Sequence, residues 1–567
     1  MKKNYLFLIC IICSINLFAQ WSGDPVNGGT PVCIAPTSEQ SKISVSDGAN
    51  GAIIVFQSYD NNTNSDDFYV QRINSLGMVS WGNNITPKPV CVNATEKELV
   101  NAIPDGNGGV FIAWVDYRRA LSGDIYMQHI SNSGNPLWAI NGIRVNSVGS
   151  RELFTANLCL DGSTGVIVCW DESINDPNSD FISYSQVFAQ KFNANGTAQW
   201  TAGGIQICTA SGFRGGGNIT ADGSNGAIIC FGDTRNSNQT PTGDFNNIDI
   251  YAQRLNSSGA LLWTGNGVAI NTQPFNQFPS NSFVQSYNPV IPDGAGGVIM
   301  LFDDYTGDND GNNNLYAQRL NANGARQWAA AGVPVCTADS SQYLIKNVSD
   351  GAGGMVVFFN DDREGILNSS ALYAQRILNN GTASWAVNGV KIIADAGYFG
   401  GNSNGMTEDG AGNYIFCWTD PVTYFLKAQK INNSGTIQWA AGGKDVCSNP
   451  EAYPYLGQLI KSNAGSTIIS WVDGRNPTTT FDIYAAKISD AGNLVAGGVS
   501  TSFITTANGN WNAPATWVGG VVPPATAIVT IRHTVTVTTN ASCKALKVEK
   551  PTGSITVNTG INLTVQQ

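Results

Sequence analysis

Residues 293–336 read DGAGGVIMLFDDYTGDNDGNNNLYAQRLNANGARQWAAAGVPVC. The stretch contains an Asp-Gly turn, an apolar run, a variant of the phrase DIYAQR, and a Trp element that ends in Val-Cys. The same order recurs along most of the 567-residue chain, with turns that begin at Asp47, Asp105, Asp161, Asp222, Asp293, Asp350 and Asp409 and a degenerate eighth at Asn463. Intervals of 56 to 71 residues between the intact turns indicate stacked supersecondary units.

Each repeat has the spacing of β-strands. Its apolar residues have a period of two, and Gly, Asn, Asp and Ser interrupt them every few residues. A repeat contains four such runs, named A, B, C and D in chain order. Run B is almost continuously apolar, so we expect it to be buried on both faces. Eight four-stranded units of this length predict an all-β fold, the β-propeller.

The two ends of the repeat array complement each other. The chain opens on a lone D-type run, from Trp21 to Cys33, and the eighth repeat ends at DIYAAKISDAGNLV (482–495) without a Trp element. We therefore expect an eight-bladed β-propeller over residues 20–500 that is closed by its N-terminal strand. The expected closure resembles that of WD-repeat propellers. A closed ring leaves no blade with an uncovered face.

The flanking segments predict an exported protein with a second, small domain. Residues 1–19 have two lysines and an apolar stretch, the layout of a signal peptide. No later stretch approaches the roughly 20 apolar residues of a membrane helix, so we expect a secreted protein, extracellular or at the cell surface. Residues 501–526 form a Gly/Pro-rich hinge, and residues 527–567 predict a small all-β module, β-helix-like or a β-sandwich, truncated or capped by another segment.

The charge of the chain argues against a nucleic acid as its partner. The chain carries a net charge of -11 and has no run of Lys or Arg, so a nucleic acid is not expected as a partner.

Ten cysteines follow the signal peptide and occupy equivalent apolar places in several repeats. We interpret them as small buried hydrophobic residues, with Cys169–Cys208 and Cys417–Cys447 as the alternative disulfide pairs. A monomer without a cofactor is expected.

The phrases DIYAQR, W..nG..VC and DG.GG together resemble a repeat of secreted bacterial proteins that are exported by type IX secretion. The resemblance covers residues 21–500. It implies a repeat architecture in a secreted protein, and it does not imply an activity.

Loop lengths indicate where a ligand would bind. The A-to-B and C-to-D turns are short and nearly constant, whereas the B-to-C loops of repeats three and four and the connector into repeat five are long. These insertions fall on one face of adjacent blades, where extra length serves binding. The ligand-binding candidates are Phe181, Tyr184, Asp244, Phe245, Phe275, Phe278, Phe283 and Tyr287. Aromatic groups beside polar ones suit a sugar or a protein surface.

Two further patterns carry carboxylates. The segment GDNDGNNNLY (307–316) has the alternate oxygen groups that calcium favours, from Asp308, Asp310, Asn312 and Asn314. Aspartates also close run B in successive repeats, and we interpret them as turn acceptors paired with a nearby Arg: Asp60, Asp116, Asp171, Asp233, Asp304, Asp362, Asp420 and Asp473. The sequence has no His-Glu-x-x-His motif, and no catalytic residue is assigned.

Three functions stay open from the sequence. The first is a non-catalytic extracellular adhesion or binding module that recognises a glycan or a protein through the long-loop face of repeats three to five. The second is a secreted polysaccharide hydrolase or lyase that uses loop carboxylates. The third is a structural spacer. Converging non-repeated acids in a concave pocket would favour the enzyme, and a shallow aromatic patch would favour binding.

Overall fold

The computed structural model divides the chain into two units, Met1–Val495 and Ala496–Gln567. The structure describes residues 21–565 except 27, 61–64, 94, 120–122, 147–152, 175–183, 238–246, 280–287, 306–311, 364–370, 394–404, 464, 477–480, 497–501, 518–521, 524–527, 544 and 550–551.

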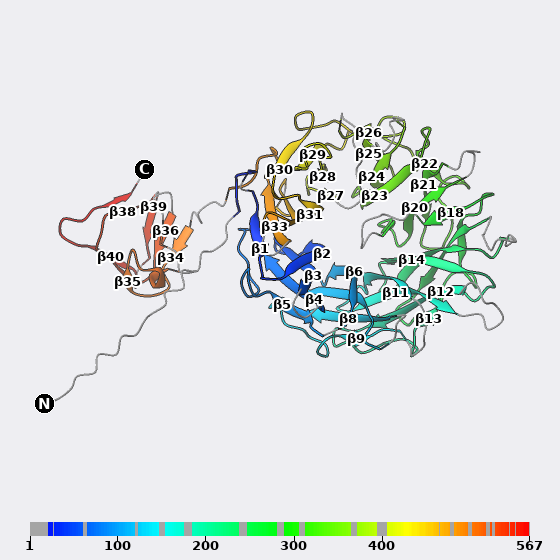
Figure 1. The fold of residues 1–567 in the computed structure, drawn as a ribbon, viewed down its shortest axis with the longest axis horizontal. Coiled ribbons are helices and arrows are strands. Elements are labelled where there is room, and N and C mark those ends of the chain that lie inside the picture. The colour runs from blue at the N-terminus through cyan, green and yellow to red at the C-terminus, as the bar shows by residue number, and fades with distance from the viewer. Residues whose placement is uncertain are drawn as a thin grey trace. The chain divides into compact units, whose positions relative to one another are not determined.

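The first unit is an eight-bladed β-propeller, as the sequence predicts (Figure 1). Its described residues form eight antiparallel sheets around one axis, and strand A of each repeat lies nearest that axis. The first four blades have these strands: β2 (Ser38–Ser46), β3 (Ala52–Asp60), β4 (Ser65–Ile73) and β5 (Lys88–Cys91); β6 (Lys97–Pro104), β7 (Val110–Asp116), β8 (Asp124–Ile130) and β9 (Ile143–Arg144); β10 (Leu153–Leu160), β11 (Val166–Ile174), β12 (Tyr184–Phe192) and β13 (Ile205–Gln206); β14 (Arg214–Ala221), β15 (Ala227–Asp233), β16 (Asp249–Leu255) and β17 (Val268–Asn271).

Blades five to eight continue the order. Their strands are β18 (Gln277–Pro279), β19 (Val290–Pro292), β20 (Val298–Asp304), β21 (Asn314–Leu320) and β22 (Val333–Cys336); β23 (Gln342–Ser349), β24 (Met355–Asp361), β25 (Ala371–Ile377) and β26 (Val390–Lys391); β27 (Gly405–Glu408), β28 (Tyr414–Thr419), β29 (Leu426–Ile431) and β30 (Lys444–Cys447); and β31 (Tyr455–Lys461), β32 (Thr467–Asp473) and β33 (Asp482–Ile488). In blade five the two short strands β18 and β19 both pair with β20.

The first strand of the chain closes the ring. β1 (Thr30–Cys33) pairs antiparallel with β33 of blade eight, with Pro31 opposite Tyr484 and Cys33 opposite Ile483. Strand B is buried along its length in most blades, as β7 and β15 show. All ten described cysteines are buried and free, in agreement with their interpretation as small hydrophobic residues.

A tryptophan from each blade bonds to the next blade. Trp81 of blade one donates its indole N–H to the Asn132 carbonyl of blade two at 3.0 Å. Among the described residues eight such bonds run around the ring at 2.8 to 3.2 Å, from Trp21, Trp81, Trp138, Trp200, Trp263, Trp328, Trp385 and Trp439. Trp21 precedes β1 and donates to Ser75 of blade one, so the chain start supplies the eighth bond.

The Gln and the Arg of the DIYAQR phrase stabilise this tryptophan contact and the Asp-Gly turn of the same repeat. Gln71 accepts the Trp81 backbone N–H at 3.1 Å and donates to the Asn83 carbonyl at 2.9 Å, which holds the tryptophan in place. Arg72 pairs with Asp47 at 2.9 Å, and Asp47 also accepts two amides of its own turn. The eighth repeat has Ala486 at the position of this glutamine, and its tryptophan, Trp21, comes from the start of the chain.

The second unit is a small parallel β-coil. Its three ladders are β34 (Ser502–Ile504), β36 (Ile528–Ile531) and β39 (Ala545–Val548); β35 (Gly509–Asn510), β37 (Thr534–Val537) and β40 (Ser554–Val557); and β38 (Ala541–Cys543) and β41 (Leu563–Val565). All pairs are parallel, the arrangement of the predicted β-helix-like alternative. A short 3-10 helix, η1 (Pro514–Thr516), lies between β35 and β36.

The segment predicted as a hinge, 501–526, differs from the prediction because it contributes to this second unit. β34 pairs with β36, which starts 24 residues after the end of β34, and Trp511 and Trp517 are buried in the core. The Gly/Pro-rich composition indicated a linker. Parallel pairing between strands so far apart in the chain leaves no local pattern, so the sequence did not reveal these strands. No helix among the described residues has the length and apolar character needed to cross a membrane.

Removal of the Trp21 side chain tests the closure. We expect Trp21→Ala to lower the free energy of unfolding by about 3–5 kcal/mol, the usual cost of deleting a large buried aromatic side chain. Trp328→Ala is the matched control inside the ring, and urea titration measures both. The closure would be contradicted if Trp328→Ala lowered the free energy of unfolding by this amount and Trp21→Ala left it unchanged.

Glu39 of β2 gives the closure a pH dependence. Its side chain is completely buried at the junction of blades one and eight. Burial raises its pKa to about 8, and the nearby Asp482 adds to the rise, while hydrogen bonds from Thr37 and Ser58 oppose it. Because the pKa in the folded state exceeds the unfolded value, the contribution of Glu39 to stability is complete below about pH 4.5 and is lost as the pH rises through about 8.

We therefore expect Glu39→Gln to gain stability relative to the parent chain by about 1.4 kcal/mol per pH unit between about pH 5 and pH 8. Urea unfolding at pH 5, 7 and 9 measures the difference. The exposed Glu451→Gln is the control and should show no such trend. A difference for Glu39→Gln that does not change with pH would contradict the burial of a neutral acid at this junction.

Candidate functional site

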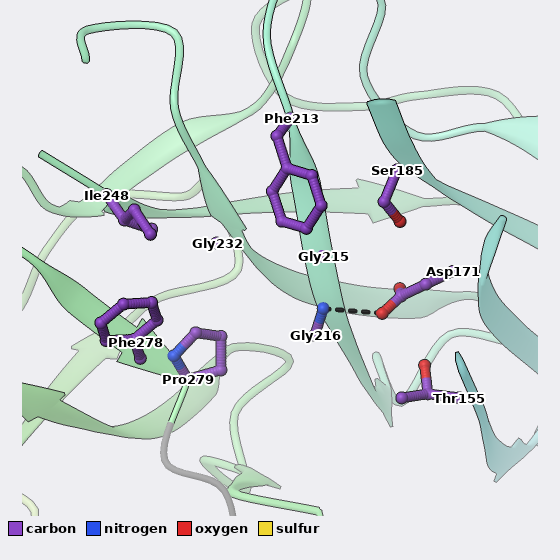
Figure 2. Close-up of a pocket in the computed structure, with 10 residues that line it drawn as sticks. All are labelled: Thr155, Asp171, Ser185, Phe213, Gly215, Gly216, Gly232, Ile248, Phe278 and Pro279. Atoms are coloured by element: carbon purple, nitrogen blue, oxygen red, sulfur yellow. Dashed lines mark hydrogen bonds between the residues drawn. The ribbon is translucent and has the colours of Figure 1, made fainter. Parts of the chain in front are cut away.

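A cavity of about 400 Å³ lies among blades three, four and five. Its lining comes from the strand ends next to the B-to-C loops, which is the face that the sequence predicts for binding (Figure 2). The lining residues are Thr155, Asp171, Ser185, Phe213, Gly215, Gly216, Gly232, Ile248, Phe278 and Pro279. One side of the cavity is therefore aromatic and aliphatic, and the other carries one carboxyl group and two hydroxyl groups.

Asp171 reaches the cavity because the third repeat departs from the pattern of its neighbours. In blade two, Trp114 donates its indole N–H to Asp116 at 3.0 Å, and Arg118 pairs with the same carboxylate. In blade three the corresponding indole, of Trp170, donates to Glu172 at 3.2 Å. Side chains alternate along a strand, so Asp171 points to the opposite face of β11 from Glu172. Its carboxyl group faces blade four and the cavity (Figure 2).

This geometry corrects the interpretation of the strand-B aspartates. The predicted pairing with a following Arg occurs for Asp116, Asp233 and Asp473. In blade six the following Arg363 pairs with Asp361. Asp171 does not belong to the set, because Glu172 takes that position. The error arose because the sequence alignment took an aspartate at the end of each apolar run. The acid that matters is the one two residues after the aromatic residue of strand B, because these two side chains lie on the same face of the strand.

A run of glycines brings blade four against Asp171. The pairing of β14 with β15 shifts between Gly215 and Asn218, which marks a β-bulge. At this bulge Gly216 and Gly217 donate their backbone N–H groups to the two Asp171 oxygens, at 2.7 and 3.0 Å. A Cβ on Gly217 would lie 2.9 Å from an Asp171 oxygen. The sequence RGGG (214–217) therefore allows the backbone itself to bind the carboxyl group.

The carboxyl group of Asp171 has a raised pKa. Burial raises its pKa to about 6, and the hydrogen bonds from Gly217 and Gly216 lower it in part. No Lys, Arg or His among the described residues pairs with it. The group can therefore exist in both the protonated and the ionised form near neutral pH, as a donor or as an acceptor of a hydrogen bond.

Ser185 adds a free hydroxyl group next to this acid. The residue is 1% exposed, and its Oγ has no hydrogen-bond partner among the described residues. A buried polar atom without a partner is rare and costly in a protein. Figure 2 shows the hydroxyl on the same side of the cavity as Asp171, with the Phe213 ring beside it. A polar ligand in the cavity would satisfy this hydroxyl.

The apolar wall completes the site. Phe213 precedes β14, and Phe278 and Pro279 come from the connector into blade five, which the sequence identified as long. Phe278 also packs edge-on against Tyr305, with ring centroids 5.7 Å apart, which fixes its orientation. The ring of Phe213 lies between Ile248 and the polar side of the cavity (Figure 2).

The ligand-binding residues predicted from the sequence have different outcomes. Phe278 lines the cavity. Phe275 is 63% exposed in a left-handed backbone conformation and does not line it. Tyr184 is the first residue of β12 and precedes Ser185; its side chain is outside the described part. The others also lie outside the described residues: Phe181, Asp244, Phe245, Phe283 and Tyr287.

The calcium hypothesis stays a prediction. Asp308 and Asp310 lie outside the described residues. Asn312 accepts a hydrogen bond from the Ser341 hydroxyl at 3.3 Å, and Asn314 begins β21 opposite Asp304. The part of the chain that the structure describes contains no group of three or more acidic, His or Cys side chains that could hold a metal ion.

No family model matches the chain, and no curated protein matches it in sequence. Several solved structures are similar at low identity. A protein of unknown function from Dyadobacter fermentans is 9% identical, with 60% of this chain and 96% of that chain covered and a TM-score of 0.32. An α-L-arabinofuranosidase from Fusarium graminearum, in complex with an iminosugar inhibitor, is 9% identical over 69% and 93% of the two chains, with a TM-score of 0.31. An α-L-arabinanase from Penicillium chrysogenum, complexed with arabinobiose, is 12% identical over 68% and 93%, with a TM-score of 0.32.

Gly217→Ala tests how tightly the cavity wall is packed. Its Cβ would meet an Asp171 oxygen and a Val187 methyl group, both at 2.9 Å. We expect the substitution to destabilise the propeller by about 1–3 kcal/mol. Gly232→Ala, in the same lining but with its nearest neighbour at 3.4 Å, is the control and should change stability by less than about 0.5 kcal/mol. Equal effects of the two substitutions in thermal or urea unfolding would contradict the close approach of β14 to Asp171.

Proposed function

We propose that this protein is an extracellular carbohydrate-binding propeller, with its ligand in the cavity among blades three, four and five. The observation that supports the proposal most is the unpartnered Ser185 hydroxyl beside the Asp171 carboxyl group, opposite the rings of Phe213 and Phe278. Sugars offer both surfaces that such a site needs. Their hydroxyl groups bond to polar side chains, and their C–H faces pack against aromatic rings.

The charge of the cavity favours a neutral ligand. The described lining contains no Lys, Arg or His, and its one titratable group is an acid. A phosphate or a carboxylate would find no cation there, and the net charge of -11 would repel it further. The volume of about 400 Å³ lies within the usual range for small-molecule sites, which is about 300–1,000 Å³. We therefore infer that the site accepts one or two units of an uncharged glycan.

Hydrolysis of a glycan is the second candidate function. The pKa of Asp171, raised to about 6, suits a group that donates a proton to a leaving oxygen. A glycosidase also needs a second carboxylate, at about 5–9.5 Å. Asp171 is the one acid in the described lining. The second acid would have to come from the long loops, where Asp176, Asp180 and Asp244 lie outside the described residues.

A glycan panel followed by calorimetry tests the proposal. We expect a neutral oligosaccharide to bind the parent chain, and Phe213→Ala to weaken that binding by at least about tenfold, which corresponds to about 1.4 kcal/mol. Tyr424→Ala removes an exposed aromatic ring of blade seven and is the control that should leave the affinity unchanged.

Three outcomes separate the candidate functions. Binding without release of reducing ends supports the binding module. Release of reducing ends that Asp171→Asn abolishes, with an optimum near pH 6, supports the hydrolase instead. Absence of any bound glycan, or binding that Phe213→Ala does not affect, would contradict a carbohydrate site in this cavity and would favour a structural spacer.

A further inference from the structure

The connector into blade five is bonded directly to the wall of the cavity. The backbone N–H of Gln277 donates to the Ile248 carbonyl at 2.7 Å, and the Asn276 side-chain oxygen accepts the Ile248 N–H at 3.0 Å. Ile248 and Phe278 both line the cavity, on the side away from its polar side chains (Figure 2). The segment that begins just after Phe275 is therefore part of the apolar wall.

Phe275 lies at the edge of this wall and not in its lining. Consecutive Cα atoms are about 3.8 Å apart, so the Cα atom of Phe275 lies within about 11 Å of that of Phe278. Its side chain is 63% exposed, and in the part of the chain that the structure describes it contacts no other aromatic ring. An apolar ring that stays in water adds no burial energy to the fold. Packing of the propeller therefore does not explain its position.

The backbone of Phe275 has a conformation that a bulky residue rarely adopts. Its φ is 73°, in the left-handed region, where a large side chain costs free energy. Residues held in such conformations gather at ligand sites, where the surrounding structure fixes them. The repeated turns of this propeller use asparagine at left-handed positions, namely Asn50, Asn141, Asn225, Asn266 and Asn388.

The turn that carries the Phe275 ring is held in place from inside the protein. The side-chain amide of the buried Gln277 donates to the Phe275 carbonyl at 3.0 Å and to the Pro274 carbonyl at 3.4 Å. The backbone below the ring is therefore fixed before a ligand arrives. Such preorganisation lowers the entropy cost of binding.

Tyr424 of blade seven shows which of these features is specific to Phe275. Tyr424 is 56% exposed and also has a left-handed backbone, with a φ of 58°. It packs against Tyr453, with ring centroids 6.2 Å apart, and the described lining of the cavity contains no residue of blades seven and eight. The uncovered ring next to the cavity wall is therefore the feature that distinguishes Phe275.

We propose that Phe275 forms an outer subsite that stacks one further sugar ring of a chain that also fills the cavity, so that the ligand is a neutral polysaccharide chain and not a free mono- or disaccharide. This inference rests on the function proposed for the cavity. The C–H face of a sugar packs against an aromatic ring, and both apolar surfaces lose water when they meet. A cavity of about 400 Å³ leaves the rest of a longer chain at its rim, where this ring lies.

Calorimetry with oligosaccharides of increasing length tests the subsite. The probes are cello-, xylo-, manno- and malto-oligosaccharides, from the disaccharide to the hexasaccharide, titrated into the full chain. In a series that binds, we expect the affinity of the parent chain to rise about fivefold or more between the disaccharide and the tetrasaccharide, the size of one aromatic contact. Phe275→Ala should lose that rise and keep the affinity for the disaccharide. Phe275→Gly, which tolerates the left-handed backbone, should give the same result and excludes a disturbed turn as the cause.

Two control variants separate this subsite from the cavity. Tyr424→Ala should keep the rise in affinity with chain length, and Phe213→Ala should weaken the binding of every length. An affinity that does not rise beyond the disaccharide, or a rise that persists in either Phe275 variant, would overturn the outer subsite and leave the function proposed for the cavity in place. Absence of binding by all four series would overturn both.

Discussion

The indole hydrogen bond between neighbouring blades is the contact on which this propeller depends. Each blade presents a largely buried tryptophan whose N–H reaches a carbonyl of the next blade. The bond fixes the orientation of the next blade, and the ring of the tryptophan covers apolar surface at the junction. A linear array would leave the last such contact unmade. The chain avoids this because Trp21 and β1 return to blade eight, so that the contact between blade eight and blade one is equivalent to those inside the ring.

The repeats that depart from the common pattern carry the chemistry. In blade three, Glu172 replaces the usual aspartate and leaves Asp171 free to face a cavity. In blade four, a glycine run lets the backbone approach that acid. The regular contacts elsewhere provide a rigid frame, so that these local departures are held in place by neighbours on both sides.

The sequence predicts the fold more fully than the site, for physical reasons. The period, the apolar B strands and the complementary chain ends depend on local patterns, and all three appear in the structure. The cavity depends on which face of a strand a residue occupies after a bulge, and on contacts between residues such as Asp171 and Gly217, 46 positions apart. The Trp170–Glu172 spacing was the one local signal that could have separated Asp171 from the other aspartates. The two strands inside the predicted hinge depend on parallel pairing over long separations, which has no local pattern either.

Closure of the ring is most directly measured by a cross-link between its first and last strands. Thr30 and Ala485 are partners across β1 and β33, and paired positions on antiparallel strands are close enough for a disulfide. In the variant that carries both Thr30→Cys and Ala485→Cys, mild oxidation and mass spectrometry should find an intramolecular disulfide between these positions in the monomer. Two free thiols, or a disulfide only between separate chains, would contradict the closure.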